Sequence, residues 1–336
     1  MKTAVELDSV SLQTELEEAL EEVERRLKDS VVGARGLVDS LTGHLMAAGG
    51  KRMRPLMTLL CATLGSPAKR TSNEVLTAAV VVELTHLATL YHDDVMDSAP
   101  SRRGAPAAQR LWGNNRAILA GDVLFARASK RVAKLGPEAV AQHATCFERL
   151  CLGQLNETFG PEQGEDAVDF YIQVLADKTG SLVAQAARYG AELSGAGPEV
   201  AGYVAEYGEK VGVAFQIADD VLDLTSDPEM SGKTPGTDLR EGVDTLPVLL
   251  LKKQRQEGNI DAAGQRILAL LGEDLEDDAN LNAVVQSVRE HPVLEQTRDL
   301  ARAWAGEAKA VLQALPDSPG RAALVEFADL LVDRLA

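Results

Sequence analysis

Three aspartates follow the most apolar stretch of this chain, and their spacing suits the binding of a metal ion. The stretch runs from Val75 to Tyr91, and Asp93, Asp94 and Asp97 come directly after it. In a helix, Asp93 and Asp97 lie four residues apart, so their carboxylates share one face and repel each other unless a cation lies between them. Oxygen ligands of this kind suit Mg²⁺, whose coordination is usually completed by water and substrate phosphates. A single cluster also fits an ordinary solvated helix end.

A second cluster of the same design favours the metal interpretation. Asp219, Asp220 and Asp223 come far along the chain, beginning directly after the segment FQIA at residues 215–218. Solubility gives no reason to repeat this pattern after two buried helices. We therefore expect two helix ends that face each other across a helical bundle and hold several Mg²⁺ ions between them.

Basic residues lie where they could bind anions. The segment GGKRMRP at residues 49–55 places three cations after two glycines, with Pro55 expected at the first position of the next helix. Lys and Arg at a helix amino terminus provide donors for an anion, although a basic surface turn has the same pattern. Arg102 and Arg103 follow in a loop marked by Pro and Gly. Lys178 lies in an apolar stretch of a later helix, where it either extends to solvent or serves a site.

The elements that position these residues are predicted to be helices throughout. Apolar residues recur at helical spacing, and no alternating strand pattern or hairpin signal of any length is present. Residues 232–242 (GKTPGTDLREG) are expected to form a loop that could close over a site. With no obvious linker, the chain is predicted to be one all-α domain covering residues 1–336. The expected helices cover residues 12–28, 38–46, 75–97, 115–134, 138–159, 166–193, 200–224 and 245–252, one beginning at 55, and others towards 336.

Composition excludes some classes of protein. Apolar residues make up 45% and aromatic residues only 4%, as in packed helices. The formal charge of −17 argues against a nucleic-acid partner and requires any phosphate site to be locally basic or metal-assisted. An odd number of cysteines without CxxC spacing fits a reducing, cytoplasmic location; they are Cys61, Cys146 and Cys151.

No targeting or membrane segment is expected. The first 30 residues are charged and helical in pattern, unlike a signal peptide. The apolar stretch Val75 to Tyr91 is interrupted by Glu83 and His86, so it is predicted to be a core helix and not a membrane span.

Together, these motifs resemble those of the trans-type polyprenyl diphosphate synthases. GGKRMRP, HDDVMD followed by RRG, KTG, FQIADDVLD and GKTPGTDLREG occur in the family's order and spacing, and the similarity runs from about residue 12 to the end. The residues around the first cluster are most similar to those of long-chain bacterial members. The resemblance implies a homodimer of the all-α isoprenoid-synthase fold, with the active site in a deep central cavity.

In this family an allylic diphosphate ionises, isopentenyl diphosphate attacks the carbocation and a proton is lost; successive trans additions lengthen the chain and release diphosphate. The resemblance implies Mg²⁺, about three ions per active site. Two of the ions would be bound by Asp93 and Asp97 and the third by Asp219. Metal-bound water would be ordered by Asp94, Asp220 and Asp223.

The resemblance also assigns residues to the two substrates. Donors to the allylic diphosphate would be Arg102, Lys178 and Lys233, and the same pocket would be lined by Thr179 and Gln216. The isopentenyl diphosphate site, which needs cations but no metal, would contain Lys51, Arg54, His86 and Arg103. Released diphosphate would accept the proton, so no side-chain base is expected. The catalytic residues would be Asp93, Asp94, Asp97, Asp219 and Asp220, together with Lys178 and Gln216.

One departure and three alternatives accompany this interpretation. Many relatives carry a second lysine where this chain has Val243, which removes one candidate cation from the allylic site. A geranylgeranyl diphosphate synthase is the main alternative. A class I terpene cyclase would usually replace the second cluster with an Asn/Ser/Glu motif, and a non-catalytic synthase subunit would usually lack intact clusters.

Product length is expected to depend on the helix that leads into Asp93. The residues four, five and eight positions before Asp93 are Thr89, Ala88 and Thr85, all small, where short-chain relatives carry bulky aromatics. A helix of about 17 residues is roughly 25 Å long and would flank several isoprene units. We therefore expect a product longer than geranylgeranyl, unless Ala88 and Thr89 pack against a neighbouring helix and the tunnel closes elsewhere.

Overall fold

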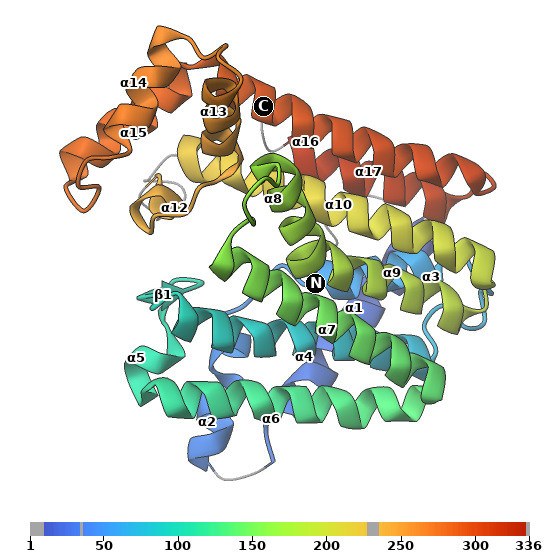
Figure 1. Cartoon of the computed structure of the whole chain (residues 1–336). Helices are drawn as coiled ribbons and strands as arrows, with labels where there is room; N and C mark the ends of the chain where they lie inside the picture. Colours follow the sequence, from blue (N-terminus) through green and yellow to red (C-terminus); the bar gives the residue numbers. More distant parts are fainter. Residues whose placement is uncertain (1–9, 34–35, 227–234, 334–336) are drawn as a thin grey trace. The chain divides into compact units, whose positions relative to one another are not determined.

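The computed structural model describes residues 10–33, 36–226 and 235–333 as an almost entirely helical chain (Figure 1). The described residues fall into two compact units. Unit 1 comes from residues 1–148, 181–208 and 311–327, and unit 2 from residues 149–180, 209–310 and 328–336. Four helices contribute residues to both units: α7 (Pro137–Phe159), α10 (Pro198–Thr225), α16 (Pro292–Val311) and α17 (Pro319–Asp333).

The other elements belong to one unit each. Those of unit 1 are α1 (Val10–Val31), α2 (Gly36–Ala47), α3 (Met53–Ala62), α4 (Asn73–Met96), β1 (Ser101–Arg102), β2 (Ala105–Pro106), α5 (Ala108–Trp112), α6 (Asn114–Val132), η1 (Ala133–Leu135), α9 (Ser181–Ser194) and η3 (Leu312–Ala314). Those of unit 2 are α8 (Ala167–Leu175), the π-helical turn η2 (Ala176–Gly180), α12 (Thr237–Arg240), α13 (Leu246–Gln256), α14 (Ala262–Leu270) and α15 (Asp278–Glu290).

Helix α4 is the central element of unit 1. Ser72 caps it by accepting a hydrogen bond from the backbone N–H of Val75, and the apolar run that follows is almost completely buried. Helix α6 approaches closely because position 121 is glycine: a Cβ there would lie 2.3 Å from Nε2 of His92 and 3.1 Å from the carbonyl oxygen of Ala88. This packing fixes the carboxyl-terminal half of α4, where the first aspartates lie.

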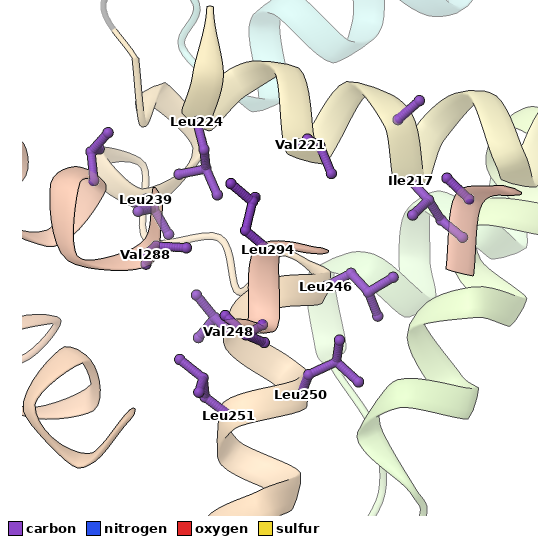
Figure 2. Close-up of a cluster of buried hydrophobic side chains, with 14 of the residues drawn as sticks. Ile217, Val221, Leu224, Leu239, Leu246, Val248, Leu250, Leu251, Val288 and Leu294 are labelled. Carbon is purple, nitrogen blue, oxygen red and sulfur yellow. The ribbon is translucent and has the colours of Figure 1, made fainter. Parts of the chain in front are cut away.

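Helix α10 has the corresponding place in unit 2. Figure 2 shows Ile217, Val221 and Leu224 of α10 in a buried apolar cluster with side chains that include Leu246 of α13 and Leu294 of α16. Because positions 217, 221 and 224 recur at helical spacing, one face of α10 is anchored in this core. The second aspartate cluster lies in the last two turns of the same helix.

Among the described residues, α4 is the helix that is long and apolar enough to cross a membrane by length and composition. Of its most apolar window, 78% is buried inside the protein, and the core helix of a globular protein passes the same test. The prediction of a core helix is thus consistent with its burial.

The all-α prediction is confirmed, with local corrections. The helix expected over residues 166–193 is divided by the π turn η2, where the chain packs closely on two other helices. Helix α3 begins at Met53, so Pro55 is its third residue and not its first; a proline is accepted there because the N–H groups of the first turn have no partner within the helix. The single domain over residues 1–336 stays a prediction.

Candidate active site

The first aspartate cluster lies at the carboxyl end of α4, where a helix carries partial negative charge. Asp97 is the C-cap, and its N–H donates to the carbonyl oxygen of Asp93 at 2.8 Å, which confirms the four-residue helical relation between the two aspartates. Asp93 is half-buried and Asp97 exposed. The negative charges of these two carboxylates are repelled by the carboxyl end of the helix dipole and by each other. A bound divalent cation would compensate both repulsions.

The middle aspartate of this cluster is turned into the protein. Asp94 is fully buried, and one of its oxygens, Oδ1, accepts hydrogen bonds from Nε and Nη2 of Arg102, both at 2.6 Å. Its other oxygen, Oδ2, is buried without a hydrogen-bond partner among the described residues. Burial raises the pKa of Asp94 above its usual range, and Arg102 opposes that shift. Asp94 and Arg102, which the sequence assigned to different tasks, are therefore one ion pair.

Arg102 and Arg103 lie on a minimal hairpin that the sequence did not predict. Strands β1 and β2 pair Ser101 with Pro106 and Arg102 with Ala105, and Arg103 and Gly104 form the turn, both with positive φ. Positive φ at both central residues is the geometry of a type I′ turn, which follows the twist of the strands. A non-glycine residue such as Arg103 adopts it at some cost, and strain of this kind collects at functional sites.

Two side chains fasten this hairpin loop to the rest of unit 1. The Nε2 group of Gln109 donates to the carbonyl oxygens of Asp94 and Ala99, both at 2.7 Å, and His44 Nε2 lies 2.8 Å from the carbonyl oxygen of Pro106. Gln109 and His44 were not predicted from the sequence. Their residue types do not indicate a role, because they bind backbone carbonyl groups that come together only in the folded chain.

A group of cations lies near the middle of α4. Arg103 Nη1 donates to the carbonyl oxygens of Gly49 and of Leu45, the latter at 3.2 Å. Gly50 lets this side chain approach, because a Cβ there would lie 2.7 Å from Arg103 Nη1. Burial lowers the pKa of Arg54 and of Arg103 below the usual arginine range, and the Nε group of Arg54 is buried without a partner among the described residues.

His86 and Lys51 complete the predicted isopentenyl diphosphate residues. Burial, followed by the positive charge of Arg54 and Arg103, lowers the pKa of His86 well below its usual range, so its ring is a neutral hydrogen-bonding group. Lys51 is exposed. The structure thus brings Arg54, His86 and Arg103 into one electrostatic environment, which an anion would stabilise.

Arg52, the remaining cation of the 49–55 segment, has a structural role. It is buried, and its guanidinium contacts Glu24 of α1 at 2.8 Å and Glu83 of α4 at 3.0 Å. Glu83 had been considered only as an interruption of an apolar run. A charged carboxylate buried in such a run requires a paired cation. The position of Glu83 in the sequence could therefore have predicted an ion pair.

The second aspartate cluster, in unit 2, has a different environment. Asp220 is buried, and its Oδ2 accepts hydrogen bonds from the hydroxyl of Tyr171 at 2.9 Å and from the backbone N–H of Leu246 at 3.1 Å. Burial raises the pKa of Asp220 to about 8. Asp219 and Asp223 are half-buried, and Asp223 Oδ2 lies 3.4 Å from the backbone N–H of Asp238 at the start of α12.

Lys178 and Thr179 lie on the π turn η2. The Nζ group of Lys178 lies 2.5 Å from a carboxylate oxygen of Glu157, and Thr179 is buried. Turns of this kind are rare and are frequent at functional sites. Gln216, on α10, is half-buried. Glu157 was not among the predicted site residues.

Two of the residues considered from the sequence lie in the loop after α10. Lys233 lies outside the described residues, so its assignment to the allylic diphosphate stays a prediction. Val243, which stands where many relatives have lysine, is partly exposed. A nearby lysine, Lys252, is paired with Asp244.

The donor chemistry fits a divalent cation. Asp93 and Asp97 offer oxygen ligands alone, at a helix end that cations stabilise. Among the described residues, no group of three or more His, Cys, Asp or Glu side chains is arranged to hold a metal ion. Sites completed by water and substrate phosphates need only one or two carboxylates from the protein.

The sequence as a whole was compared with known proteins. The model of the polyprenyl synthetase family matches residues 36–288. The chain belongs to this family. It is also 46% identical over 317 residues to the nonaprenyl diphosphate synthase of Mycobacterium tuberculosis, which covers 94% of this chain and 91% of that protein. The chain is accordingly a prenyltransferase of the polyprenyl diphosphate synthase type, similar to long-chain bacterial members, as the resemblance implied.

Solved structures support the same assignment. The geranylgeranyl pyrophosphate synthase of Corynebacterium glutamicum, complexed with calcium and isoprenyl diphosphate, aligns with a TM-score of 0.86 and 39% identity over 99% of this chain and 100% of that one. The polyprenyl synthase of Caulobacter crescentus, also complexed with calcium and isoprenyl diphosphate, aligns with a TM-score of 0.83 and 32% identity over 98% and 99%. The predicted isoprenoid-synthase fold is confirmed, and its central cavity stays a prediction.

Proposed function

We propose that this prenyltransferase is Mg²⁺-dependent and extends an allylic diphosphate by successive trans additions of isopentenyl diphosphate to a medium- or long-chain product. One observation in unit 1 carries this proposal. Helix α4 contributes His86 to a cationic group and, two turns later and about 10 Å along the axis, Asp93 to an acidic group. A reaction that uses two diphosphates, of which only one must leave, needs one site with a metal and one with cations alone.

The residue roles follow this division. Asp93, Asp97 and Asp219 would hold about three Mg²⁺ ions, as the family resemblance implies. Bound Mg²⁺ supplies the positive charge that makes diphosphate a good leaving group. The predicted allylic donors are Arg102, Lys178 and Lys233, and Thr179 and Gln216 would line that pocket.

The isopentenyl diphosphate site would be formed by Lys51, Arg54, His86 and Arg103. Arg54 and Arg103 have lost solvation on burial, so a diphosphate there restores the interactions that water gave them. His86 is neutral and would act as a hydrogen-bonding group. The diphosphate released in each cycle would take the proton, so no side-chain base is assigned.

An assay of the purified chain tests this function. With Mg²⁺, farnesyl diphosphate and isopentenyl diphosphate, we expect diphosphate release that stops when isopentenyl diphosphate is omitted or the metal is chelated. Release without isopentenyl diphosphate would indicate a cyclase. Absence of activity in the chain alone would indicate a subunit that requires a partner.

For product length, the structure gives more detail on α4. Ala88 is fully buried near Gly121 of α6, and the buried hydroxyl of Thr85 lies 2.9 Å from His143 Nε2, whereas Thr89 is half-buried. Thr85 and Ala88 thus lie against neighbouring helices. The alternative in which the tunnel closes elsewhere requires such packing of Ala88 and Thr89, so Ala88 agrees with it and Thr89 is half-buried. The small size of all three residues and the similarity to a nonaprenyl diphosphate synthase support a product longer than geranylgeranyl.

Chromatography of the products made from farnesyl diphosphate and excess isopentenyl diphosphate measures this length. We expect products beyond geranylgeranyl, and Ala88→Phe should shorten them if position 88 borders the growing chain. Leu330→Phe, at a partly exposed position of α17, is the control for an added aromatic ring. A sharp stop at geranylgeranyl in the wild-type chain would favour the geranylgeranyl diphosphate synthase alternative.

We also propose that the protein is a homodimer and is cytoplasmic. Large apolar side chains are exposed on α5 and α6 of unit 1, namely Leu111, Ile118 and Leu119, the last being 61% exposed. Exposed apolar groups of this size are a common mark of a protein interface. Light scattering after gel filtration should give a dimer, and Leu119→Glu should shift it to the monomer; a wild-type monomer would contradict the proposal.

A further inference from the structure

The π turn η2 is held by one face of helix α7 within unit 2. Arg149, Gly153 and Glu157 are spaced four residues apart on α7, so they form a single stripe along that face. Each contacts the turn: Arg149 pairs with Asp177, Gly153 lies against the turn's backbone, and Glu157 pairs with Lys178. The two ion pairs have opposite polarity, so each charged side chain of the turn has its own partner.

The backbone of the turn is fixed by close packing. A Cβ at Gly153 would lie 2.8 Å from the backbone nitrogen of Lys178, and a Cβ at Gly212 of α10 would lie 2.6 Å from the Cα of Gly180. Distances below 3.0 Å to backbone atoms leave no room for a side chain. The turn therefore has α7 on one side and α10 on another.

Arg149 connects the turn to both of these helices. Its Nε and Nη2 groups each lie 2.8 Å from Oδ1 of Asp177, and Nη1 lies 2.6 Å from a carboxylate oxygen of Glu209 on α10. Gln173 Nε2 donates to the other oxygen of Asp177 at 3.0 Å. The backbone carbonyl of Glu209 is also the group nearest to Gly180, where a Cβ would meet it at 3.0 Å. Arg149 thus holds the charged residue directly before Lys178.

We infer that Arg149 is a positioning residue for the prenyl transfer reaction: by clamping Asp177 to Glu209 it fixes the π turn that presents Lys178 and Thr179 to the allylic diphosphate. This inference rests on the proposed role of Lys178. Arg149 acts through Asp177 and the backbone of the turn. Loss of the clamp leaves Lys178 in the chain but lets the turn relax, so binding of the allylic diphosphate weakens while the isopentenyl diphosphate site in unit 1 is unaffected.

Steady-state kinetics of Arg149→Met with each substrate varied in turn provide the test. We expect the KM for the allylic diphosphate to rise about tenfold and that for isopentenyl diphosphate to change less than about twofold. Arg302→Met is the matched control, because Arg302 also bridges two carboxylates in unit 2, those of Glu295 and Asp299, on the exposed face of α16. An equal rise in both KM values, or the same selective rise in Arg302→Met, would overturn the inference.

A double mutant separates positioning from a merely structural effect. In a Lys178→Ala background, Arg149→Met should raise the allylic KM by less than about twofold, because the residue that it positions is gone. A full tenfold rise in that background would show that Arg149 acts by another route. If Arg149→Met does not fold, Asp177→Asn is used in both experiments, with the same expected and contradicting results.

Binding of a non-cleavable allylic thiolodiphosphate, measured by calorimetry with Mg²⁺, distinguishes this inference from the proposed function. Weaker binding by Arg149→Met in a chain that does not condense the two substrates would support the inference while the function fails. Unchanged binding by Arg149→Met in an active chain would overturn the inference and leave the function intact.

Discussion

The two aspartate clusters have the same spacing but compensate the charge of their middle residue differently. In unit 1, Asp94 is fully buried and forms an ion pair with Arg102 through two nitrogens at 2.6 Å. In unit 2, Asp220 is buried, and within the part of the chain that the structure describes it accepts hydrogen bonds from two neutral donors, the Tyr171 hydroxyl and the Leu246 N–H. Burial raises the pKa of both carboxyls; at Asp94 the charge of Arg102 opposes the shift, whereas the pKa of Asp220 is raised to about 8.

In both clusters the middle aspartate differs from the flanking aspartates in its burial. Asp94 continues the buried stripe of Leu84, Leu87 and Tyr91 on α4, at helical spacing. Asp220 likewise lies on the face of α10 that carries Ile217, Val221 and Leu224. The middle aspartates are therefore part of the buried face, while Asp93, Asp219 and Asp223 are half-buried and Asp97 is exposed.

The largest expected effect is on catalysis and concerns the flanking aspartates of both regions. Asp93→Ala and Asp219→Ala should each lower turnover by about 10³-fold or more while circular dichroism stays unchanged, because each removes a predicted metal ligand. Asp299→Ala, on an exposed face of α16, is the control and should retain activity. Near-normal condensation by either active-site mutant with Mg²⁺ present would refute the assignment.

The middle aspartates should differ in their effect on stability. Asp94→Asn weakens a buried ion pair and should lower the free energy of unfolding by about 2–3 kcal/mol. Asp220→Asn keeps an oxygen that accepts both neutral donors and removes a carboxyl whose pKa is raised in the folded chain, so it should not lower the free energy of unfolding. Urea denaturation at neutral pH, with a chelator present, measures the free energy of unfolding of both mutants. Equal losses would mean that the two environments are equivalent.

The two arginines of the hairpin should have separable effects on the substrates. Arg102→Ala should raise the KM for the allylic diphosphate about tenfold, and Arg103→Ala that for isopentenyl diphosphate, because Arg102 contacts Asp94 of the acidic cluster and Arg103 lies with Arg54. Steady-state kinetics with each substrate varied in turn provide the measurement. If each mutant affected both substrates equally, this division between the two sites would be wrong.

A further expected effect is on the pH dependence of stability in the metal-free protein. The pKa of Asp220 is about 8 in the folded chain and near 4 when unfolded, so between these values the folded state binds the extra proton. Its contribution therefore falls as pH rises from about 4 to about 8, by at most about 1.4 kcal/mol per pH unit. Asp220→Asn should flatten the decline measured by denaturation; an unchanged slope would contradict the raised pKa.

The sequence by itself determined the helical class, the family and the acidic clusters. These are local properties: apolar residues at helical spacing, and aspartates four residues apart at a helix end. The same periodicity also places Asp94 and Asp220 on buried faces. The assignments of Arg54, His86 and Arg103 to one environment came from the family resemblance, and the structure brings them together.

Only the tertiary structure decided which charges meet. Arg102 pairs with Asp94, Arg52 with Glu83, and Arg149 with Asp177 and Glu209, each across different elements. The π turn at Lys178 likewise lies in close glycine contacts with α7 and α10, which no local pattern of residues 166–193 shows. Helical spacing fixes which side a residue faces, but the partner on that side depends on how separate helices pack.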